Sequence, residues 1–359
     1  MNLITFSYDT NPLGEDDRWH LEPVKLGRLN LIVGKNATGK SRALVVIHSF
    51  AKMIHKADVI YLGVFDFFFQ KGAAEYHYTI SNKDGNIIET LLIDGKPFAE
   101  RENTTARIFS VKQNVWQEVS PPADRLLLHV RRDIEEYAYF EEIITWSENV
   151  QNFSFGHVHV SSFIEGTQEK VPASIENIPE LIQEMSPEQK VKLLSDLNSI
   201  GYNISKLDTR KGKGDIPFLY IKENEVKGII TQRVISQGMF RVIALLIFIH
   251  HLLEQKKASL IVIDDLCEGL DYERATKLGK LLFGSLLPEN VQLVATSNDS
   301  FLMDVVDIKD WNVFHRKGTC VKSLNYRENK SLFENFKFSG LSNFDFFSSD
   351  YIASHLNQE

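Results

Sequence analysis

The stretch LNLIVGKNATGKSRALVVI places a glycine- and lysine-rich turn between two apolar segments. Residues 29–33 form a short apolar run of the kind found in buried strands, and an apolar, helix-like stretch follows Ser41. The turn from Gly34 to Ser41 has the spacing G-x-x-x-x-G-K-S. This spacing between a strand and a helix is the context in which a phosphate-binding loop forms. A chance glycine-rich turn is the alternative, and the matching flanks disfavour it.

Each part of this loop has a chemical reason. The glycines let backbone N–H groups turn toward an anion, and the start of the following helix adds positive partial charge. Lys40 is expected to reach the β- and γ-phosphates of ATP, and the Ser41 hydroxyl to ligate Mg²⁺. The predicted nucleotide-binding residues are Gly34, Lys35, Asn36, Ala37, Thr38, Gly39, Lys40, Ser41 and Arg42.

The stretch SLIVIDDLCEGLD (259–271) ends an apolar, strand-like run in two adjacent aspartates. A carboxylate at the edge of a core needs a compensating partner, and a cation is the simplest one. In phosphate-loop ATPases a second strand ends in an aspartate that holds the magnesium ion. We therefore predict that Asp264 is a magnesium ligand. A plain strand-end cap is the alternative.

The segment ISQGM (235–239) precedes this strand and opens an apolar helical stretch. The order of ISQGM, the magnesium strand and the pair Leu270-Asp271 resembles that of ABC-type ATPases. In that family the LSGGQ signature binds the γ-phosphate of a nucleotide held by the other subunit. Ser236 and Gly238 match the signature, Gln237 replaces a glycine, and Asp271 matches the D-loop aspartate. For SQG alone, a helix N-cap is the alternative.

The same resemblance implies further site residues. The family's switch histidine is absent from VQLVATSNDSFL, where Asn298, or Ser297 in another register, can still hydrogen-bond a phosphate oxygen. The family's glutamate base is replaced by Asp265, which is one methylene shorter, and Glu268 is its rival. Gln70 is a candidate Q-loop ligand of magnesium, with a polar residue that ends a core strand as the alternative.

The chain resembles the soluble ABC-type ATPases of the SMC, RecF and OLD group. It is similar, more narrowly, to AAA-domain ATPases of bacterial phage-defence and toxin–antitoxin-like operons, at residues 140–156, the helix after the signature, and 339–352. OLD enzymes carry a Toprim nuclease domain, which is not expected here because only about 60 residues follow the switch strand. The resemblance implies a slow ATPase that forms a homodimer around nucleotide and regulates a separate effector, a nuclease or toxin, in antiviral defence.

Two other functions stay open. One is a RecF-like DNA-binding repair ATPase, which the net charge of −8 disfavours weakly. The other is a non-catalytic scaffold that binds ATP, which the missing switch histidine and Asp265 leave possible. The chain has only two cysteines and no pattern of a signal peptide, so we expect a reducing, cytoplasmic location. No membrane partner is expected, because the apolar run 242–253 is too short to span a bilayer and indicates a buried helix.

The expected fold class is α/β: an ABC-type ATPase head with a flanking antiparallel β-sheet and an inserted, mainly helical lobe. Residues 1–115 and 219–359 form the head, and residues 116–218 form the lobe. Alternation over 76–101 predicts a β-meander with turns at 84–85 and 94–95. A helix is expected over 186–202, capped by Ser186 in a capping box with Gln189. Residues 205–216 are expected to be an exposed loop.

Two histidines in FGHVHVSS, His157 and His159, could share one strand face and bind a metal. No nearby cysteine, aspartate or third histidine completes such a site, so ordinary packing is the favoured interpretation. The segment RKGKG (210–214) is basic and could touch nucleic acid, although a plain linker is the simpler interpretation.

Overall fold

The computed structural model describes residues 1–10, 18–57, 59–158, 178–212, 217–256, 259–337, 340–348 and 351. The chain divides into two compact units. The first contains Met1–Val150 and Lys309–Asn335, and the second contains Gln151–Ile308 and Phe336–Glu359.

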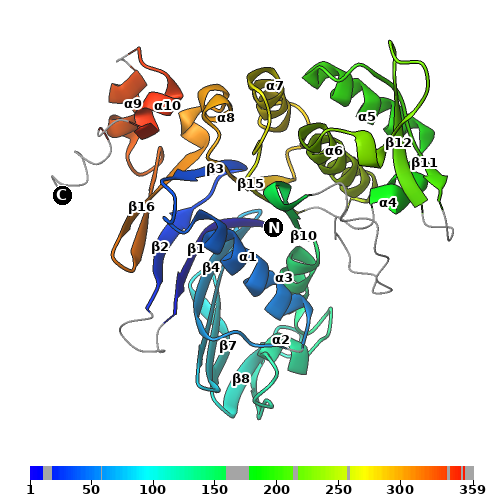
Figure 1. Cartoon of the computed structure of the whole chain (residues 1–359). Helices are drawn as coiled ribbons and strands as arrows, with labels where there is room; N and C mark the ends of the chain where they lie inside the picture. Colours follow the sequence, from blue (N-terminus) through cyan, green and yellow to red (C-terminus); the bar gives the residue numbers. More distant parts are fainter. Residues whose placement is uncertain are drawn as a thin grey trace. The chain divides into compact units, whose positions relative to one another are not determined.

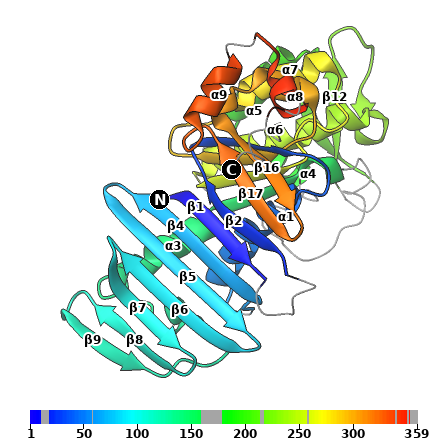
Figure 2. The ribbon, with the colours of Figure 1, turned by 90° about the vertical axis from the view of Figure 1, so that its left-hand side faces the viewer.

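The first unit is built on a large mixed sheet with the strand order β3-β16-β17-β2-β1-β4-β5-β6-β7-β8-β9. Strand β3 is parallel to β16, and β17 is parallel to β2. From β2 to β9 in this order, each strand is antiparallel to its neighbour. Figure 2 shows β1 and β4 to β9 side by side. The strands are β1 (Asn2–Asp9), β2 (His20–Lys25), β3 (Leu29–Gly34), β4 (Gly63–Lys71), β5 (Ala74–Lys83), β6 (Asn86–Ile93), β7 (Lys96–Glu102), β8 (Thr105–Ser110), β9 (Val115–Val119), β16 (Trp311–Lys317) and β17 (Cys320–Asn325).

The predicted meander over 76–101 is confirmed, and it continues to β9. Asp84 and Asp94 have positive φ values, as the tight turns between these strands require. Alternation in β4 turns Phe65, Phe67 and Phe69 to one face, where α1 (Lys40–His55) and α3 (Ala138–Glu148) cover them. Phe50 of α1 stacks on Phe67 at 3.8 Å, and Trp146 of α3 meets Phe69 edge-on at 4.7 Å. A short helix, α2 (Leu127–Val130), precedes α3.

The second unit is organised around α6 (Gln237–Gln255). Helices α4 (Ile178–Glu184) and α5 (Pro187–Ile200) pack against it (Figure 1). Strands β14 (Leu260–Asp264) and β15 (Gln292–Thr296) are parallel, and β10 (Val150–Ser154) lies beside β14. A separate sheet has the order β11-β12-β13. The remaining elements of this unit are β11 (Ile204–Lys211), β12 (Pro217–Glu223), β13 (Ile230–Thr231), α7 (Tyr272–Leu282), α8 (Ser300–Val305), α10 (Asn343–Ser348) and the 3₁₀ turns η1 (Phe155–His157) and η4 (Gln232–Val234). Most of α9 (Lys330–Lys337) and of the 3₁₀ turn η5 (Ile308–Asp310) belongs to the first unit.

Helix α6 confirms the buried helix that the run 242–253 predicts. In length and composition α6 could also cross a membrane, and no other helix in the described ranges could. However, 67% of its most apolar window is buried inside the protein. Its composition is therefore explained by its place in the core of the second unit.

The helix predicted over 186–202 is confirmed as α5. Ser186 Oγ accepts a hydrogen bond from Gln189 N at 3.3 Å, Pro187 opens the helix, and Gly201 ends it in the left-handed conformation. The Gln189 side chain differs from the expected capping box, because its Oε1 lies 3.3 Å from His250 Nδ1. This contact links α5 to α6.

The loop predicted over 205–216 is wrong for its first part. Residues 204–211 form strand β11, which pairs with β12. Only Ile204 and Leu207 of this strand are buried, so the sequence lacks the alternation that marks a strand. Residues 213–216 lie outside the described residues.

Residues 116–218, the expected lobe, belong to both units, with 116–150 in the first and 151–218 in the second. They contain α2 to α5, and also most of β9, all of β10 and β11, and the start of β12. The boundaries of an inserted lobe therefore stay a prediction.

Candidate functional site

The phosphate loop of the first unit has the backbone that its sequence predicts. Strand β3 ends at Gly34, and α1 begins at Lys40. Ala37 (φ 64°) and Gly39 (φ 98°) both lie in the left-handed region, which folds the loop back over itself. Two side chains brace it: Thr38 Oγ1 donates to Lys35 O at 2.8 Å, and Arg316 of β16 donates to Ala37 O at 3.0 Å.

Lys40 lies inside this loop. Its Nζ donates to Gly34 O at 2.7 Å and Lys35 O at 3.4 Å, and the residue is only 6% exposed. Gly34 is needed for this close turn, since a Cβ atom there would lie 2.6 Å from Thr38 Oγ1 and 3.0 Å from Phe314 O. The ammonium group therefore lies at the centre of a loop whose outer residues, 35–37, are exposed.

Trp19 packs against the loop, a contact that the sequence does not predict. A Cβ atom on Gly39 would lie 3.1 Å from Trp19 Cζ2, so the indole lies directly against the loop. The Arg42 guanidinium lies over the same ring at 4.3 Å from its centroid. Gly39 is therefore held both by its left-handed backbone and by lack of space for a side chain.

Ser41 and Gln70, the two predicted magnesium ligands of the first unit, lie on different elements. Ser41 is exposed in the first turn of α1. Gln70 lies near the end of β4, where its Nε2 donates to Gly72 O at 2.9 Å. Its side chain therefore stabilises the β4–β5 turn, which agrees with the strand-end alternative, and the Q-loop role stays a prediction.

In the second unit one buried hydroxyl holds the aspartate pair. Thr296 Oγ1 at the end of β15 donates to Asp264 Oδ1 at 2.5 Å and accepts from Asp265 N at 2.9 Å. Thr296 is completely buried. Sequence analysis missed Thr296, although its position follows from the parallel pairing of β14 and β15, which end together.

Asp265 has a left-handed backbone with φ 52°. Aspartate tolerates this conformation better than glutamate does, because its short side chain can hydrogen-bond locally. This gives a physical reason for aspartate at the position that the predicted resemblance aligns with the glutamate of ABC-type ATPases. Glu268 lies three residues further on, with its side chain 58% exposed and its Oε2 3.5 Å from Arg241 Nη1.

The signature segment contacts the D-loop within this unit. Ser236 is exposed and caps α6 by accepting from Met239 N at 3.4 Å, so the N-cap interpretation is confirmed and the signature role stays a prediction. A Cβ atom on Gly238 would lie 3.2 Å from both Gly269 O and Leu270 Cδ2. Glycine at 238 therefore allows the start of α6 to pack directly on the D-loop.

Asp271 caps α7. It accepts from Arg274 N at 3.0 Å and from Arg274 Nη1 at 2.6 Å. Burial alone would raise the pKa of Asp271, but these hydrogen bonds and the nearby positive charge outweigh it and lower the pKa. The side chain is therefore held as a carboxylate at the start of the helix.

The two candidates for the switch position, Ser297 and Asn298, differ in exposure. Ser297 is buried, and its hydroxyl donates to Leu266 O at 2.7 Å, so it fixes the chain after Asp265. Asn298 is exposed just after β15. Only Asn298 is accessible from solvent in this structure.

The structure describes only one member of the histidine pair. His157 lies in the 3₁₀ turn η1, and His159 lies outside the described residues. Within the described ranges, no group of three or more His, Cys, Asp or Glu side chains is placed to hold a metal ion.

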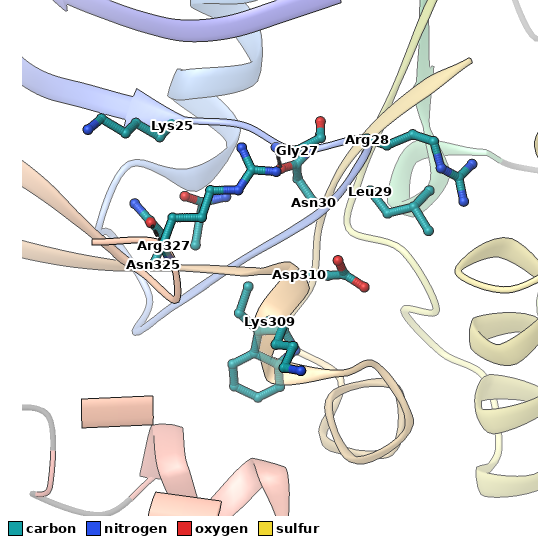
Figure 3. Close-up of a pocket in the computed structure, with 11 residues that line it drawn as sticks. Lys25, Gly27, Arg28, Leu29, Asn30, Lys309, Asp310, Asn325 and Arg327 are labelled. Atoms are coloured by element: carbon teal, nitrogen blue, oxygen red, sulfur yellow. Dashed lines mark hydrogen bonds between the residues drawn. The ribbon is translucent and has the colours of Figure 1, made fainter. Parts of the chain in front are cut away.

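A polar pocket of about 300 Å³ lies in the first unit at the start of β3 and β16. Figure 3 shows that two of its cations, Lys25 and Arg28, point in opposite directions. Lys25 is paired with Glu328 at 2.7 Å, and Arg327 donates to Leu26 O at 2.8 Å. The positive charges therefore do not converge on one anion position.

Several solved structures resemble this one. No family model matches the chain, and no curated protein matches it. An SMC head bound to the C-winged helix domain of ScpA has a TM-score of 0.55 and 10% identity, and the match covers 92% of this chain and 100% of that chain. This chain has the fold of an SMC head, an ABC-type ATPase fold. The SMC head domain from Thermotoga maritima (TM-score 0.48, 13% identity, 90% and 99% covered) and an SMC head derived from Pyrococcus furiosus (0.49, 10%, 94% and 99%) are also similar.

Proposed function

We propose that this chain binds and slowly hydrolyses ATP, and that two copies close around the nucleotide. The observation that carries the proposal is the phosphate loop. Lys40 Nζ lies at the centre of a loop with two left-handed residues, at the first position of α1. This arrangement presents an ammonium group, backbone N–H groups and a helix start to one anion, which is the chemistry of a nucleotide phosphate.

The residues present suit Mg²⁺ as well as ATP. Carboxylate and hydroxyl oxygens are the ligands that magnesium prefers, and Asp264 and Ser41 supply them in the two motifs. When bound, magnesium neutralises charge that develops on the phosphates. Thr296 orients the Asp264 carboxylate, and Asp265 is proposed to accept a proton from the attacking water. Gln70 is a further proposed ligand.

Dimerisation is supported by the surface around the signature. Ser236 is exposed, and apolar side chains next to the motifs are exposed too: Val234 before the signature is 74% exposed, and Tyr272 after the D-loop aspartate is 64% exposed. Tyr272 contacts Phe301, which is 38% exposed and follows the switch position. Exposed apolar side chains that touch one another, as Tyr272 and Phe301 do, are typical of a surface that meets another protein when polar residues surround them.

The partner and the biological role are also proposals. One similar SMC head was solved with the C-winged helix domain of ScpA bound. We propose that this head likewise acts on a separate protein, a nuclease or toxin, in cytoplasmic antiviral defence, because the motifs resemble those of defence ATPases. Copurification of the native complex would identify that partner, and a repair enzyme in its place would favour the RecF-like alternative.

The direct test is calorimetric titration of Lys40→Ala with ATP and magnesium. The variant should lose nucleotide binding and keep its fold, because the core of the unit lies in the sheet and α1. Lys83→Ala, at the exposed end of β5, is the matched control and should bind as the wild type does. Equal affinity in Lys40→Ala would rule out the proposed site.

A further inference from the structure

Arg241 lies on α6 one turn beyond the signature, and its guanidinium donates to three backbone carbonyls in two segments of the second unit. Nη2 donates to Gly156 O, Nε donates to Val158 O at 3.3 Å, and Nη1 donates to Glu268 O at 2.8 Å. Its side chain is 15% exposed. A planar guanidinium can hold several carbonyls in fixed directions at once, which a lysine cannot do.

The side chains of both candidate bases, Asp265 and Glu268, pack against the 155–158 turn that Arg241 holds. A Cβ atom on Gly156 would lie 2.5 Å from Glu268 Oε2, 3.1 Å from Asp265 Cβ and 3.3 Å from Asp265 Oδ2. The φ of Gly156 lies outside the left-handed region. The backbone there would thus accept alanine, and the three atoms nearest to its Cβ all belong to the two carboxylate side chains.

The same helix contacts the D-loop a second time. Gly238 packs on Gly269 and Leu270, and Gln237 Nε2 donates to Val158 O. The first turns of α6, the 155–158 turn and the 265–270 loop are therefore joined by side-chain and backbone contacts within one unit.

We propose that Arg241 is a positioning residue that transmits the state of the signature to Asp265 and Glu268 through the 155–158 turn. The inference rests on the proposed ATPase function and adds a route for its regulation. When a second copy's nucleotide engages Ser236, any shift of α6 moves the Arg241 guanidinium, and the turn moves with it. The carboxylates then take up or leave the position needed for proton transfer, where about 1 Å of displacement can cost roughly a hundredfold in rate.

The test compares steady-state turnover and ATP affinity in Arg241→Lys and Gly156→Ala. Both variants should lose about tenfold or more in kcat while KM and calorimetric ATP affinity stay within about twofold, because the phosphate loop is untouched. Arg210→Lys is the control for replacing an arginine in the same unit, since the Arg210 guanidinium only covers the Tyr220 ring at 4.8 Å. Melting curves check that each variant is folded.

A second comparison identifies the carboxylate that is moved. Glu268→Ala removes the atom at 2.5 Å, so the effect of Gly156→Ala should vanish in that background if it acts through Glu268 and persist if it acts through Asp265. Wild-type kcat per folded head in both Arg241→Lys and Gly156→Ala would overturn the inference, because a purely structural role lowers only the melting temperature. A wild-type chain that neither binds nor hydrolyses ATP would instead refute the proposed function, and the inference would fall with it.

Discussion

Thr296 donates its hydroxyl hydrogen to Asp264 Oδ1 at 2.5 Å, where the parallel strands β15 and β14 end side by side. The same oxygen accepts from Asp265 N at 2.9 Å. One buried hydroxyl thus fixes the direction of the first carboxylate and the left-handed backbone of the second. The geometry of the aspartate pair depends on this neighbouring strand as much as on its own sequence.

Thr296→Val should therefore harm both stability and turnover. It leaves the half-buried Asp265 N–H without this acceptor, which costs about 1–3 kcal/mol of unfolding free energy. It also removes a hydrogen bond that orients the Asp264 carboxylate, so magnesium-dependent hydrolysis should fall. Thr296→Ser keeps the hydroxyl and should lie close to wild type. Urea unfolding and ATPase assays check this, and equal values for the two variants in both assays would contradict it.

Single substitutions of Asp264, Asp265 and Glu268 should have different effects on magnesium binding and on turnover. Asp264→Ala should lose magnesium and hydrolysis together. Asp265→Asn should keep ATP-magnesium binding, because asparagine also tolerates the left-handed backbone, and should trap the closed dimer with turnover lost. Glu268→Gln should keep most turnover. Calorimetry and size-exclusion chromatography with ATP measure these outcomes. An inactive Glu268→Gln beside an active Asp265→Asn would reverse the two roles.

Two neighbouring loop positions should respond oppositely to exchanging glycine and alanine. Gly39→Ala places a Cβ atom 3.1 Å from Trp19 at φ 98°, so it should weaken ATP binding and cost about 1–2 kcal/mol of stability. Ala37→Gly removes a side chain from an exposed position at φ 64° and should leave the melting temperature unchanged or raise it. Thermal melts and calorimetry compare them. Loss of ATP binding in both variants to the same degree would contradict this account of the loop.

Stability should fall in mild acid through His129. Its Nε2 donates to Ile54 O at 2.9 Å, and burial, with smaller contributions from Arg125 and Arg132, lowers the pKa of His129 below its usual 6.5. The unfolded chain then binds a proton that the folded chain excludes. The stability it contributes is present above pH 6.5 and is lost as the pH falls below that value toward the folded pKa.

The matched variant for this effect is His129→Gln, which keeps an N–H donor for Ile54 O and does not titrate. The difference in unfolding free energy between wild type and variant should shrink between pH 7 and pH 5. Denaturant unfolding at several pH values measures it. A difference that stays constant over this range would show that His129 is not the cause.

The parts of the fold and of the site that can be predicted from the sequence are those that a few neighbouring residues determine. The phosphate loop, the turns at Asp84 and Asp94, and the cap at Ser186 each depend on a few adjacent residues and their preferred backbone angles. The order of motifs also indicates the ABC-type fold, which the likeness to an SMC head confirms. Strand β11 was missed because its pairing with β12 stabilises it without an alternating apolar pattern.

The missed residues depend on contacts between distant segments. Trp19 reaches Gly39 although two strands from the end of the chain, β16 and β17, lie between β2 and β3 in the sheet. No motif in the sequence around Trp19 or Gly39 predicts this contact. Arg241 is a single cation on an apolar helix, which by pattern alone indicates a solvated edge. Its partners, Gly156 O and Glu268 O, become visible only once the second unit has folded.

Complementation between two inactive variants tests the central claim, that two copies share each nucleotide, most directly. Lys40→Ala should not bind ATP, and Ser236→Arg should bind ATP but present no working signature. In a mixed dimer the intact phosphate loop of one copy faces the intact signature of the other. Mixing equal amounts should therefore restore ATP hydrolysis, to about a quarter of the wild-type rate per head if pairing is random. A mixture as inactive as its components, or full activity in Ser236→Arg alone, would contradict the shared site.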